Sequence, residues 1–528
     1  MAASVLHLCP LAFPVRLVSS TTRNFSPPPL LHRRAPTKLR ATVASSNTPP
    51  VDNLVLDPRE EDDKERSTEI VDYDWRKEWY PLYLTREVPD DAPLGLAVYD
   101  VSLVLYKDGH GEIRCFEDRC PHRLAKLSEG HLIDGKLECL YHGWQFAGDG
   151  SCVRIPQLSS GATIPRSACA RSYHVRDSQG VLWVWMSHDC LPDDAKLPWF
   201  ENFSRPGFQD FSTIHELPYD HSILVENVLD PSHVPISHDR TDFAAKREDA
   251  KPLRFEFTER TARGFAGWFG AEDEETISNF MRFEAPCVVS NNREFVDKNG
   301  EKHYSSGVFL CRPAGQGKSM LIIRFGGTKR FSFFKWVPQW LFHQNACKIL
   351  EEDMGFLSSQ NEALMKDKLP TKRLYLNLKS SDVWVWEYRK WLDKVGHGMP
   401  YYIGHSTISL PPDPAVVEHA RAGLHAAGSA SLPAKGAIVG IYAPNGYNRY
   451  FRHVVHCKEC TKVTKSFKKW KTTFSAAALV MAALAILASG RQWKAFLVAS
   501  AAVCVAGVYG CSLGISFNTS NHMRHHRV

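Results

Sequence analysis

Two closely spaced pairs, each made of one cysteine and one histidine, are the sharpest chemical feature of the sequence. One proline separates Cys120 from His122, two residues separate Cys139 from His142, and sixteen residues lie between the pairs. Thiolates from the two cysteines can hold one iron of a 2Fe-2S cluster while the two imidazoles hold the other. The spacing therefore predicts a 2Fe-2S cluster bound by Cys120, His122, Cys139 and His142.

Zinc is the competing metal for two cysteines and two histidines. In a zinc finger, however, cysteine is spaced with cysteine and histidine with histidine, whereas each pair in this chain is mixed. The flanking dipeptides Asp118-Arg119 and Gly143-Trp144 add to the preference for iron and sulfur. We therefore favour the cluster over a zinc ion at these four residues.

A second pattern places two histidines five residues apart in Asn227-Val-Leu-Asp230-Pro-Ser-His233-Val-Pro-Ile-Ser-His238. Its two prolines prevent a regular helix through the segment, and a bent backbone can bring both imidazoles together. An Fe(II) site of the facial-triad type needs two histidines and one carboxylate, with positions left open for dioxygen. Two histidines near an aspartate are often ordinary surface or core residues, so the segment alone makes them candidates.

Together the two patterns resemble one known family. Cys-Pro-His-Arg followed by Cys-x-Tyr-His-Gly-Trp is similar to the Rieske non-haem iron oxygenases, and Asn-x2-Asp-x2-His-x4-His resembles their mononuclear iron segment. The resemblance implies a monooxygenase with a Rieske 2Fe-2S cluster and a mononuclear Fe(II) at His233 and His238. It also implies an α+β chain, in which an all-β Rieske domain precedes a helix-grip-like α+β catalytic domain.

The third iron ligand is expected downstream, because the family draws it from a helix well beyond the two histidines. Asp353, in Glu351-Glu352-Asp353-Met354, is the predicted ligand. Glu351, Glu352 and Glu362 are competing carboxylates. The alternative to an iron ligand is that these acids only form the solvent-exposed face of a helix.

Two further residues take roles by the same resemblance. Asp230 would hydrogen-bond His233 and, in a head-to-tail homotrimer, a cluster histidine of the neighbouring subunit, which would fix the tautomer of the ligand. Asn227 would lie directly behind the iron ligands. Dioxygen activation at Fe(II) needs two electrons, of which each iron centre can hold one, so both centres are expected to be necessary.

The predicted secondary structure divides the chain into two folded parts and a linker. Residues 75–190 read as short strands separated by turns such as Asp134-Gly135, which indicates the all-β Rieske domain. Residues 201–410 mix strands with helices, the clearest helix covering 348–366, as expected for the α+β catalytic domain. Residues 411–456 are rich in Ala, Gly, Ser and Pro and read as a linker or loose cover.

A membrane hairpin is predicted near the C-terminus. Residues 474–490 and 495–517 are apolar and each about long enough to cross a bilayer, which needs roughly 17 to 25 helical residues. Two buried helices of a soluble domain are the alternative. The lysines before the first run suggest that both ends of the hairpin lie on the stromal side, although Arg491 and Lys494 in the loop oppose this.

The first fifty residues have the composition of an organellar transit peptide. They contain six basic and no acidic residues and are rich in Ser, Thr and Pro. The whole chain carries a formal charge of +6, so without this segment the charge is zero (6 − 6). Bulk charge therefore gives no support to a nucleic-acid partner.

A Cys-x-x-Cys pair, Cys457 and Cys460, lies just before the predicted hairpin and is flanked by His453 and His456. It could be a redox switch, a metal-binding pair or two thiols without function. The pair resembles the C-terminal Cys-x-x-Cys of the plant chloroplast branch of the family, whose members include pheophorbide a oxygenase. That resemblance implies regulation by thioredoxin.

Stretches such as 72–75, 119–129, 237–243 and 396–400 are most similar to the translocon-associated Rieske proteins of the chloroplast inner envelope, which are also described as phyllobilin hydroxylases. The implied reaction is hydroxylation of a linear tetrapyrrole from chlorophyll breakdown. No Gly-x-Gly-x-x-Gly fingerprint follows a predicted strand, so the electrons are expected from an external carrier, ferredoxin.

Two other functions remain open at this point. The chain could act as a redox-sensing regulatory subunit among the inner-envelope translocon components, which is compatible with a hydroxylase. It could also be an electron-transfer protein with a degenerate second site, but the complete set of His233, His238 and Asp353 argues against that.

Overall fold

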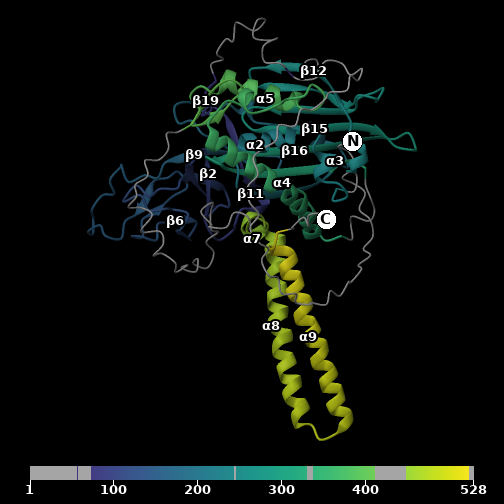
Figure 1. Ribbon diagram of the computed structural model, residues 1–528. Helices are drawn as coiled ribbons and strands as arrows, with labels where there is room; N and C mark the ends of the chain where they lie inside the picture. The colour runs from purple at the N-terminus through teal and green to yellow at the C-terminus, as the bar shows by residue number, and fades with distance from the viewer. Residues whose placement is uncertain (1–55, 57–72, 243–244, 330–336, 411–447, 522–528) are drawn as a thin grey trace, which may run out of the picture.

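The computed structural model describes residue 56 and residues 73–242, 245–329, 337–410 and 448–521 (Figure 1). The predicted transit peptide and the linker residues 411–447 lie outside the described residues. Within the described part, the chain forms a β-rich region, a large sheet packed with helices, and a long helical hairpin that projects away from both. This arrangement confirms the predicted α+β class with an N-terminal all-β domain.

The β-rich region contains two antiparallel sheets. A six-stranded sheet has the order β1-β10-β9-β4-β3-β2, and a four-stranded sheet has the order β5-β6-β7-β8. Asp134 and Gly135 both have positive φ between β5 and β6, which is the two-residue turn predicted from their sequence. The strands are β1 (Trp79–Leu84), β2 (Leu94–Val98), β3 (Val101–Lys107), β4 (Ile113–Glu117), β5 (His131–Ile133), β6 (Lys136–Glu138), β7 (Gln145–Phe146), β8 (Cys152–Arg154), β9 (Ser172–Ser178) and β10 (Val181–Trp185).

A seven-stranded antiparallel sheet with the order β11-β17-β16-β15-β14-β13-β12 forms the centre of the second region. Its first strand in the chain pairs with its last, so the segments that precede and follow the sheet lie next to each other. A two-stranded ribbon of β18 (Tyr402–Ile403) and β19 (Ile408–Ser409) follows. The strands of the large sheet are β11 (Gln209–Leu217), β12 (Leu253–Thr261), β13 (Gly264–Ala271), β14 (Asn279–Glu284), β15 (Val288–Val296), β16 (Lys302–Gly315) and β17 (Lys318–Gly327).

Helices α2 (His221–Leu229), α3 (Val234–Ser237), α4 (Gln339–Asp367) and α5 (Val383–Val395) pack with this sheet (Figure 1). The long helix α4 contains the predicted helix 348–366 and begins nine residues earlier. It starts directly after Pro338, and it ends where Lys368 takes a left-handed conformation. Apolar residues along one side of α4 are buried, and acidic residues lie among them.

One hydrophobic core joins the two regions. Trp79 of β1, Trp183 of β10 and Leu310 of β16 belong to the same set of buried, contacting side chains. The buried Arg312 side chain of β16 also donates a hydrogen bond to the carbonyl oxygen of Leu82, at a distance of 2.5 Å. A second, smaller core lies under the four-stranded sheet and includes Cys120, Leu127, Cys139 and Phe146. This second core also includes Val104 and Phe116 of the six-stranded sheet, so the four-stranded sheet is a small lobe that packs against that sheet.

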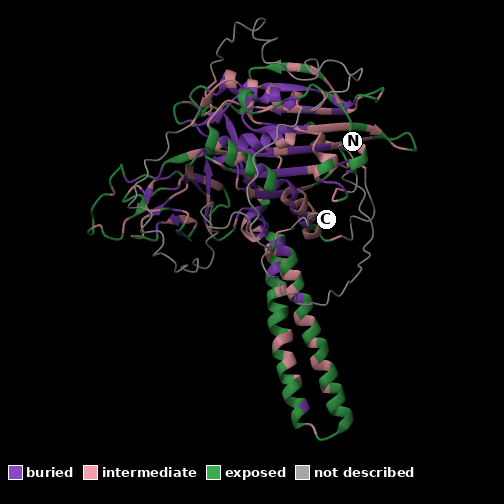
Figure 2. Cartoon of the chain, in the orientation of Figure 1, coloured by how far each residue is buried: buried purple, intermediate pink, exposed green. Residues whose placement is uncertain are grey.

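Helices α8 (Lys458–Leu487) and α9 (Arg491–Thr519) form the hairpin, and both are long and apolar enough to cross a membrane. Their outer faces are largely exposed, including Leu479, Ile486 and Val503 (Figure 2). The predicted polar loop is wrong in one respect, because the four residues from Arg491 to Lys494 form the first turn of α9. The connection is instead the short segment after Leu487.

The linker prediction is wrong for its last nine residues. Residues 449–452 form the short helix α7, and residues 454–456 form a 3-10 turn that leads into α8. The buried Arg449 side chain bonds Glu351 and Gln344 of α4, both at 2.7 Å, and the carbonyl oxygen of Phe517 in α9, at 2.7 Å. This buried polar network fixes the base of the hairpin to helix α4, a contact that composition alone did not indicate.

Candidate iron centres and substrate cavity

The four predicted cluster ligands lie on two loops of matching conformation. One loop follows β4 and the other follows β6, and in each the backbone N–H four residues after the cysteine donates to the cysteine carbonyl. Leu124 and Gly143 occupy that fourth position and both have left-handed φ, 64° and 73°. The repeated turn presents Cys120 and Cys139 in equivalent ways at the edge of the lobe.

The donor set of these loops fits a Rieske cluster. Cys120 and Cys139 are buried and face each other, and the backbone N–H groups of His122 and Arg123 donate to the Cys120 sulfur. The rings of His122 and His142 lie 4.5 Å apart at the surface. Two inner thiols and two outer imidazoles match the two ends of a 2Fe-2S cluster, with the histidine end turned toward the surface.

The three predicted ligands of the mononuclear iron converge on one point. His238 Nε2 lies 3.1 Å and His233 Nε2 lies 3.6 Å from the same carboxylate oxygen, Oδ2 of Asp353. His233 is the last residue before the short helix α3 and His238 is the first residue after it, so one helical turn sets their separation. Asp353 comes from the middle of α4, and the three side chains form a group that could hold one metal ion.

Each imidazole is held on its far side by another carboxylate. His238 Nδ1 lies 3.1 Å from Oε2 of Glu352, whose other oxygen accepts from the Thr241 hydroxyl. His233 Nδ1 lies 3.3 Å from Asp230 Oδ2, an ion-pair distance that lacks the alignment of a hydrogen bond. Carboxylates in these positions keep Nε2 unprotonated and aimed at a metal.

The electrostatics of this group favour a bound cation. Burial acts against it, but the carboxylates of Asp230 and Asp353 raise the pKa of His233 to about 10. Burial also disfavours the Asp353 carboxylate, yet the two imidazoles hold its pKa well below the usual range. This tendency to collect positive charge fits a divalent iron ion, which would replace the protons on Nε2 and be bound by two neutral imidazoles and one carboxylate.

Asn227 lies beside the group. Its amide nitrogen is 3.4 Å from both His233 Nε2 and Asp353 Oδ2. Asn227 is on the last turn of α2, and Asp230 ends that helix, so α2 places both residues relative to His233.

A cavity of about 390 Å³ opens beside the three ligands. Its wall is formed by the sheet on one side and by α4 on the other, and volumes of roughly 300–1,000 Å³ are usual for small-molecule sites. Away from the iron ligands, Asn291 and Asn345 are among the residues that bring polar groups into a largely apolar lining. The aromatic part of the lining consists of Phe211, Phe309, Phe325 and Phe342.

The competing carboxylates lie elsewhere or act differently. Glu351 bonds the buried Arg449, and Glu362 is exposed on another face of α4. Glu352 bonds His238 on the side away from Asp353. The sequence did not predict this supporting role of Glu352. Its position next to the predicted ligand Asp353 was the only feature that could have indicated it. The thiols of Cys457 and Cys460 belong to neither candidate iron centre and lie buried at the base of the hairpin.

Comparison with known proteins agrees with this arrangement. Residues 78–172 match the Rieske [2Fe-2S] domain, and residues 283–370 match the pheophorbide a oxygenase family. The chain is 66% identical to Protein TIC 55, chloroplastic, of Pisum sativum, over 90% of this chain and 86% of that protein. It is 30% identical to pheophorbide a oxygenase of Arabidopsis thaliana, over 67% of this chain and 70% of that protein.

Two further comparisons extend the relationship. Protochlorophyllide-dependent translocon component 52 of Arabidopsis thaliana is 26% identical, over 70% of this chain and 73% of that protein. The crystal structure of dicamba monooxygenase bound to dicamba aligns with a TM-score of 0.51 at 22% identity, over 61% of this chain and 97% of that one, which concerns the fold. The chain therefore belongs to the chloroplast family of Rieske oxygenases, enzymes that combine a Rieske 2Fe-2S cluster with a mononuclear iron.

Proposed function

We propose that this oxygenase hydroxylates a linear tetrapyrrole chlorophyll catabolite, a phyllobilin, with dioxygen and with electrons from ferredoxin. One observation carries the proposal: His233, His238 and Asp353 converge at the wall of a largely apolar cavity. A hydroxylase must hold an unactivated carbon next to its metal and keep bulk water away, and such a cavity can do both.

In this proposal, Cys120, His122, Cys139 and His142 hold the 2Fe-2S cluster, and His233, His238 and Asp353 hold the mononuclear iron. When bound, the two centres supply dioxygen activation and single electrons. The protein residues around them bind and orient. Glu352 keeps the His238 imidazole in the tautomer that leaves Nε2 bare, and Asp230 does the same for His233.

The cavity supports an amphiphilic substrate. Its aromatic side chains suit pyrrole rings and alkyl substituents, and Asn291 and Asn345 offer hydrogen bonds to the lactam or carboxylate groups of a tetrapyrrole. Pheophorbide a oxygenase, a relative, is named for a tetrapyrrole. The apolar hairpin would keep the enzyme at a membrane, where such a compound concentrates.

The arrangement of the two centres supports a head-to-tail homotrimer. Strand β6, which precedes one cluster loop, and helix α3, which lies between the iron histidines, are on opposite sides of the molecule (Figure 1). An electron that passes between them within one chain would have to cross the whole body. In a ring of subunits, the cluster lobe of one chain can approach the mononuclear site of the next, with Asp230 as the bridge.

We place the enzyme in the chloroplast inner envelope with its catalytic domains facing the stroma. The relatives are chloroplastic, and α8 carries Lys465, Lys468, Lys469 and Lys471 between the catalytic region and its apolar half. Segments rich in Lys and Arg tend to remain on the side of the membrane from which the helices are inserted. Arg491 and Lys494 at the far end run against this rule, so accessibility of the catalytic domain to protease in intact inner-envelope vesicles is the relevant measurement.

Turnover tests the proposed function directly. Iron-reconstituted full-length protein, given ferredoxin, a reductase, dioxygen and a linear chlorophyll catabolite, should add one oxygen atom to the catabolite, as measured by mass spectrometry. A His233→Ala variant should keep the absorption spectrum of the cluster and lose turnover. The control His110→Ala removes an exposed histidine from the β3–β4 turn and should leave turnover unchanged.

Retained turnover in His233→Ala would refute the assignment of the iron site. Oxygenation of pheophorbide a in place of the linear compound would keep the enzyme class and reject the substrate.

A regulatory subunit of the protein-import translocon is the second candidate function. Its support is the similarity to translocon component 52 and the membrane hairpin. If import is the principal function, membranes that contain the His233→Ala protein should import precursor proteins at the wild-type rate.

A further inference from the structure

A second cluster of metal-binding side chains lies where the hairpin joins the catalytic region. His343, His453, Cys457 and Cys460 are all buried, and their donor atoms lie within 4.8 Å of one another. His343 is on α4, His453 precedes α8, and the two cysteines are at the start of α8. We propose that this Cys2His2 quartet binds one structural zinc ion, which fastens the membrane hairpin to helix α4.

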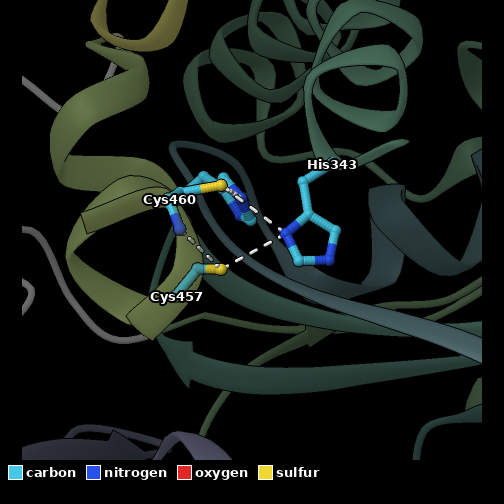
Figure 3. Close-up of side chains that lie close together, drawn as sticks. His343, Cys457 and Cys460 are labelled. Atoms are coloured by element: carbon cyan, nitrogen blue, oxygen red, sulfur yellow. Dashed lines mark hydrogen bonds between the residues drawn. The ribbon is translucent and has the colours of Figure 1, made fainter. Parts of the chain in front are cut away.

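The distances fit a tetrahedral ion. The His343 Nδ1 atom lies 3.2 Å from Cys457 Sγ and 3.5 Å from Cys460 Sγ (Figure 3). His453 Nε2 lies 3.4 Å from Cys460 Sγ. Zinc with bonds of about 2.3 Å to sulfur and about 2.0 Å to nitrogen places such neighbours about 3.5 Å apart in a tetrahedron. The quartet therefore already has the spacing that a single zinc ion requires.

The surroundings of the ligands are those of a built site. His453 Nδ1 lies 2.8 Å from the carbonyl oxygen of Ile214, so this nitrogen carries the proton and Nε2 faces the cysteines unprotonated. The backbone N–H of Cys460 donates to the Cys457 sulfur over 3.4 Å, an interaction that stabilises a thiolate. Gln344 points its amide nitrogen at the Cys460 sulfur from 3.8 Å.

Burial favours metal binding over a redox switch. The Cys457 residue is 3% exposed and Cys460 is fully buried, so thioredoxin would have to displace α8 from α4 before reaching either sulfur. The two cysteines are not joined by a disulfide.

The quartet differs from the other Cys2His2 set of this chain. At the cluster loops the cysteines are inside and the histidines are at the surface, which suits two irons bridged by sulfide. At the hairpin, all four donor residues are buried and their donor atoms lie within 4.8 Å of one another. Zinc in a closed site of this kind has a structural role.

Zinc would connect two helices that carry different functions. Helix α4 contributes His343 and, further along, the proposed iron ligand Asp353, while α8 is half of the membrane hairpin. The ion would set the direction in which the hairpin leaves the catalytic region. This role does not depend on the substrate or on the proposed hydroxylation.

Metal analysis of the full-length protein tests the site. Protein purified in detergent under nitrogen, without chelators, should contain one zinc per chain in addition to its iron. The Cys457→Ser/Cys460→Ser double variant should lose the zinc and keep the iron and the visible spectrum of the cluster. The control Cys287→Ser removes a fully buried thiol that precedes β15 and belongs to none of the candidate metal-binding groups among the described residues, and it should keep the zinc.

A spectroscopic measurement avoids the risk that the double variant does not fold. Wild-type protein should show a zinc K-edge X-ray absorption spectrum with two sulfur and two nitrogen neighbours. Wild-type protein without zinc, a disulfide between Cys457 and Cys460 in the freshly isolated protein, or zinc that persists in the double variant would each overturn the proposal.

Discussion

At the scale of single residues, the partner of a side chain decides its role more than its type does. Glu351, Glu352 and Asp353 are consecutive on α4, yet they contact a buried arginine, the outer nitrogen of a histidine and the proposed iron position. About 100° of rotation per residue separates neighbouring side chains on a helix. Three adjacent acids therefore reach three different environments.

Replacement of Glu352 tests its role as a positioning residue. Glu352→Gln keeps the size of the side chain but weakens the hold on His238 Nδ1, so the affinity for the mononuclear iron should fall by roughly 10- to 100-fold. Iron content after dialysis against graded chelator measures this, and the cluster spectrum should be unchanged. Glu362→Gln, on the exposed face of the same helix, is the matched control. Equal iron affinity in the two variants would show that Glu352 does not position His238.

At the scale of elements, helix α2 sets the positions of two residues of the mononuclear site. Asp220 caps its N-terminus by accepting from the backbone N–H of Ser222 at 2.9 Å, and its last turn carries Asn227. Asp230 ends the helix and faces His233. A shift of this one element would therefore move both residues that lie against the iron ligands.

The cap gives α2 a defined acid sensitivity. Burial opposes it, but His221 and the Ser222 hydrogen bonds lower the pKa of Asp220 to about 2. A carboxyl group with a depressed pKa stabilises the folded state above its unfolded value near 4, and this contribution is lost as the pH falls from about 4 to about 2. The contribution is about 2 kcal/mol.

Asp220→Asn should therefore unfold more easily than wild type at pH 6, and the difference should shrink below pH 4. Thermal unfolding in detergent, followed by circular dichroism at pH 6 and at a pH below 4, measures this effect. The exposed control Asp91→Asn should follow the wild type throughout. A difference for Asp220→Asn that is the same at both pH values would contradict the assigned pKa.

At the scale of the whole molecule, the separation of the two centres makes a prediction about subunits. The cluster lobe and the α3 segment lie on opposite sides of the body (Figure 1). If electrons pass between neighbouring chains of a homotrimer, two inactive variants should restore activity when they assemble together. His122→Ala removes a proposed cluster ligand, and His233→Ala removes a proposed iron ligand.

Co-expression of these two variants in equal amounts should give about a quarter of the wild-type turnover per chain, because half of the chains keep the iron site and half of these receive electrons from a neighbour with an intact cluster. Each variant expressed alone should be inactive, and mixing the separately purified, undissociated variants is the control. No recovery in co-assembled protein would mean that electrons pass within one chain.

The chemistry of the local sites could be predicted from the order of the residues alone. A thiolate or an imidazole at a given spacing has few alternative uses, so the Cys/His pairs predicted the cluster, and the family assignment and fold class are confirmed. The hairpin helices were also visible, because a long apolar run is a local property. Helix limits were less certain, since Arg491 and Lys494 are polar and yet helical.

Only the tertiary structure decided which distant residues meet. Asp353 could be distinguished from Glu351 and Glu352 as the carboxylate that faces both histidines once the direction of each side chain on α4 was known. His343 lies more than a hundred residues before Cys457 and joins it through the packing of α8 on α4. Sequence spacing fixes contacts within a turn or a loop, whereas contacts between elements depend on how their faces pack, which no single segment encodes.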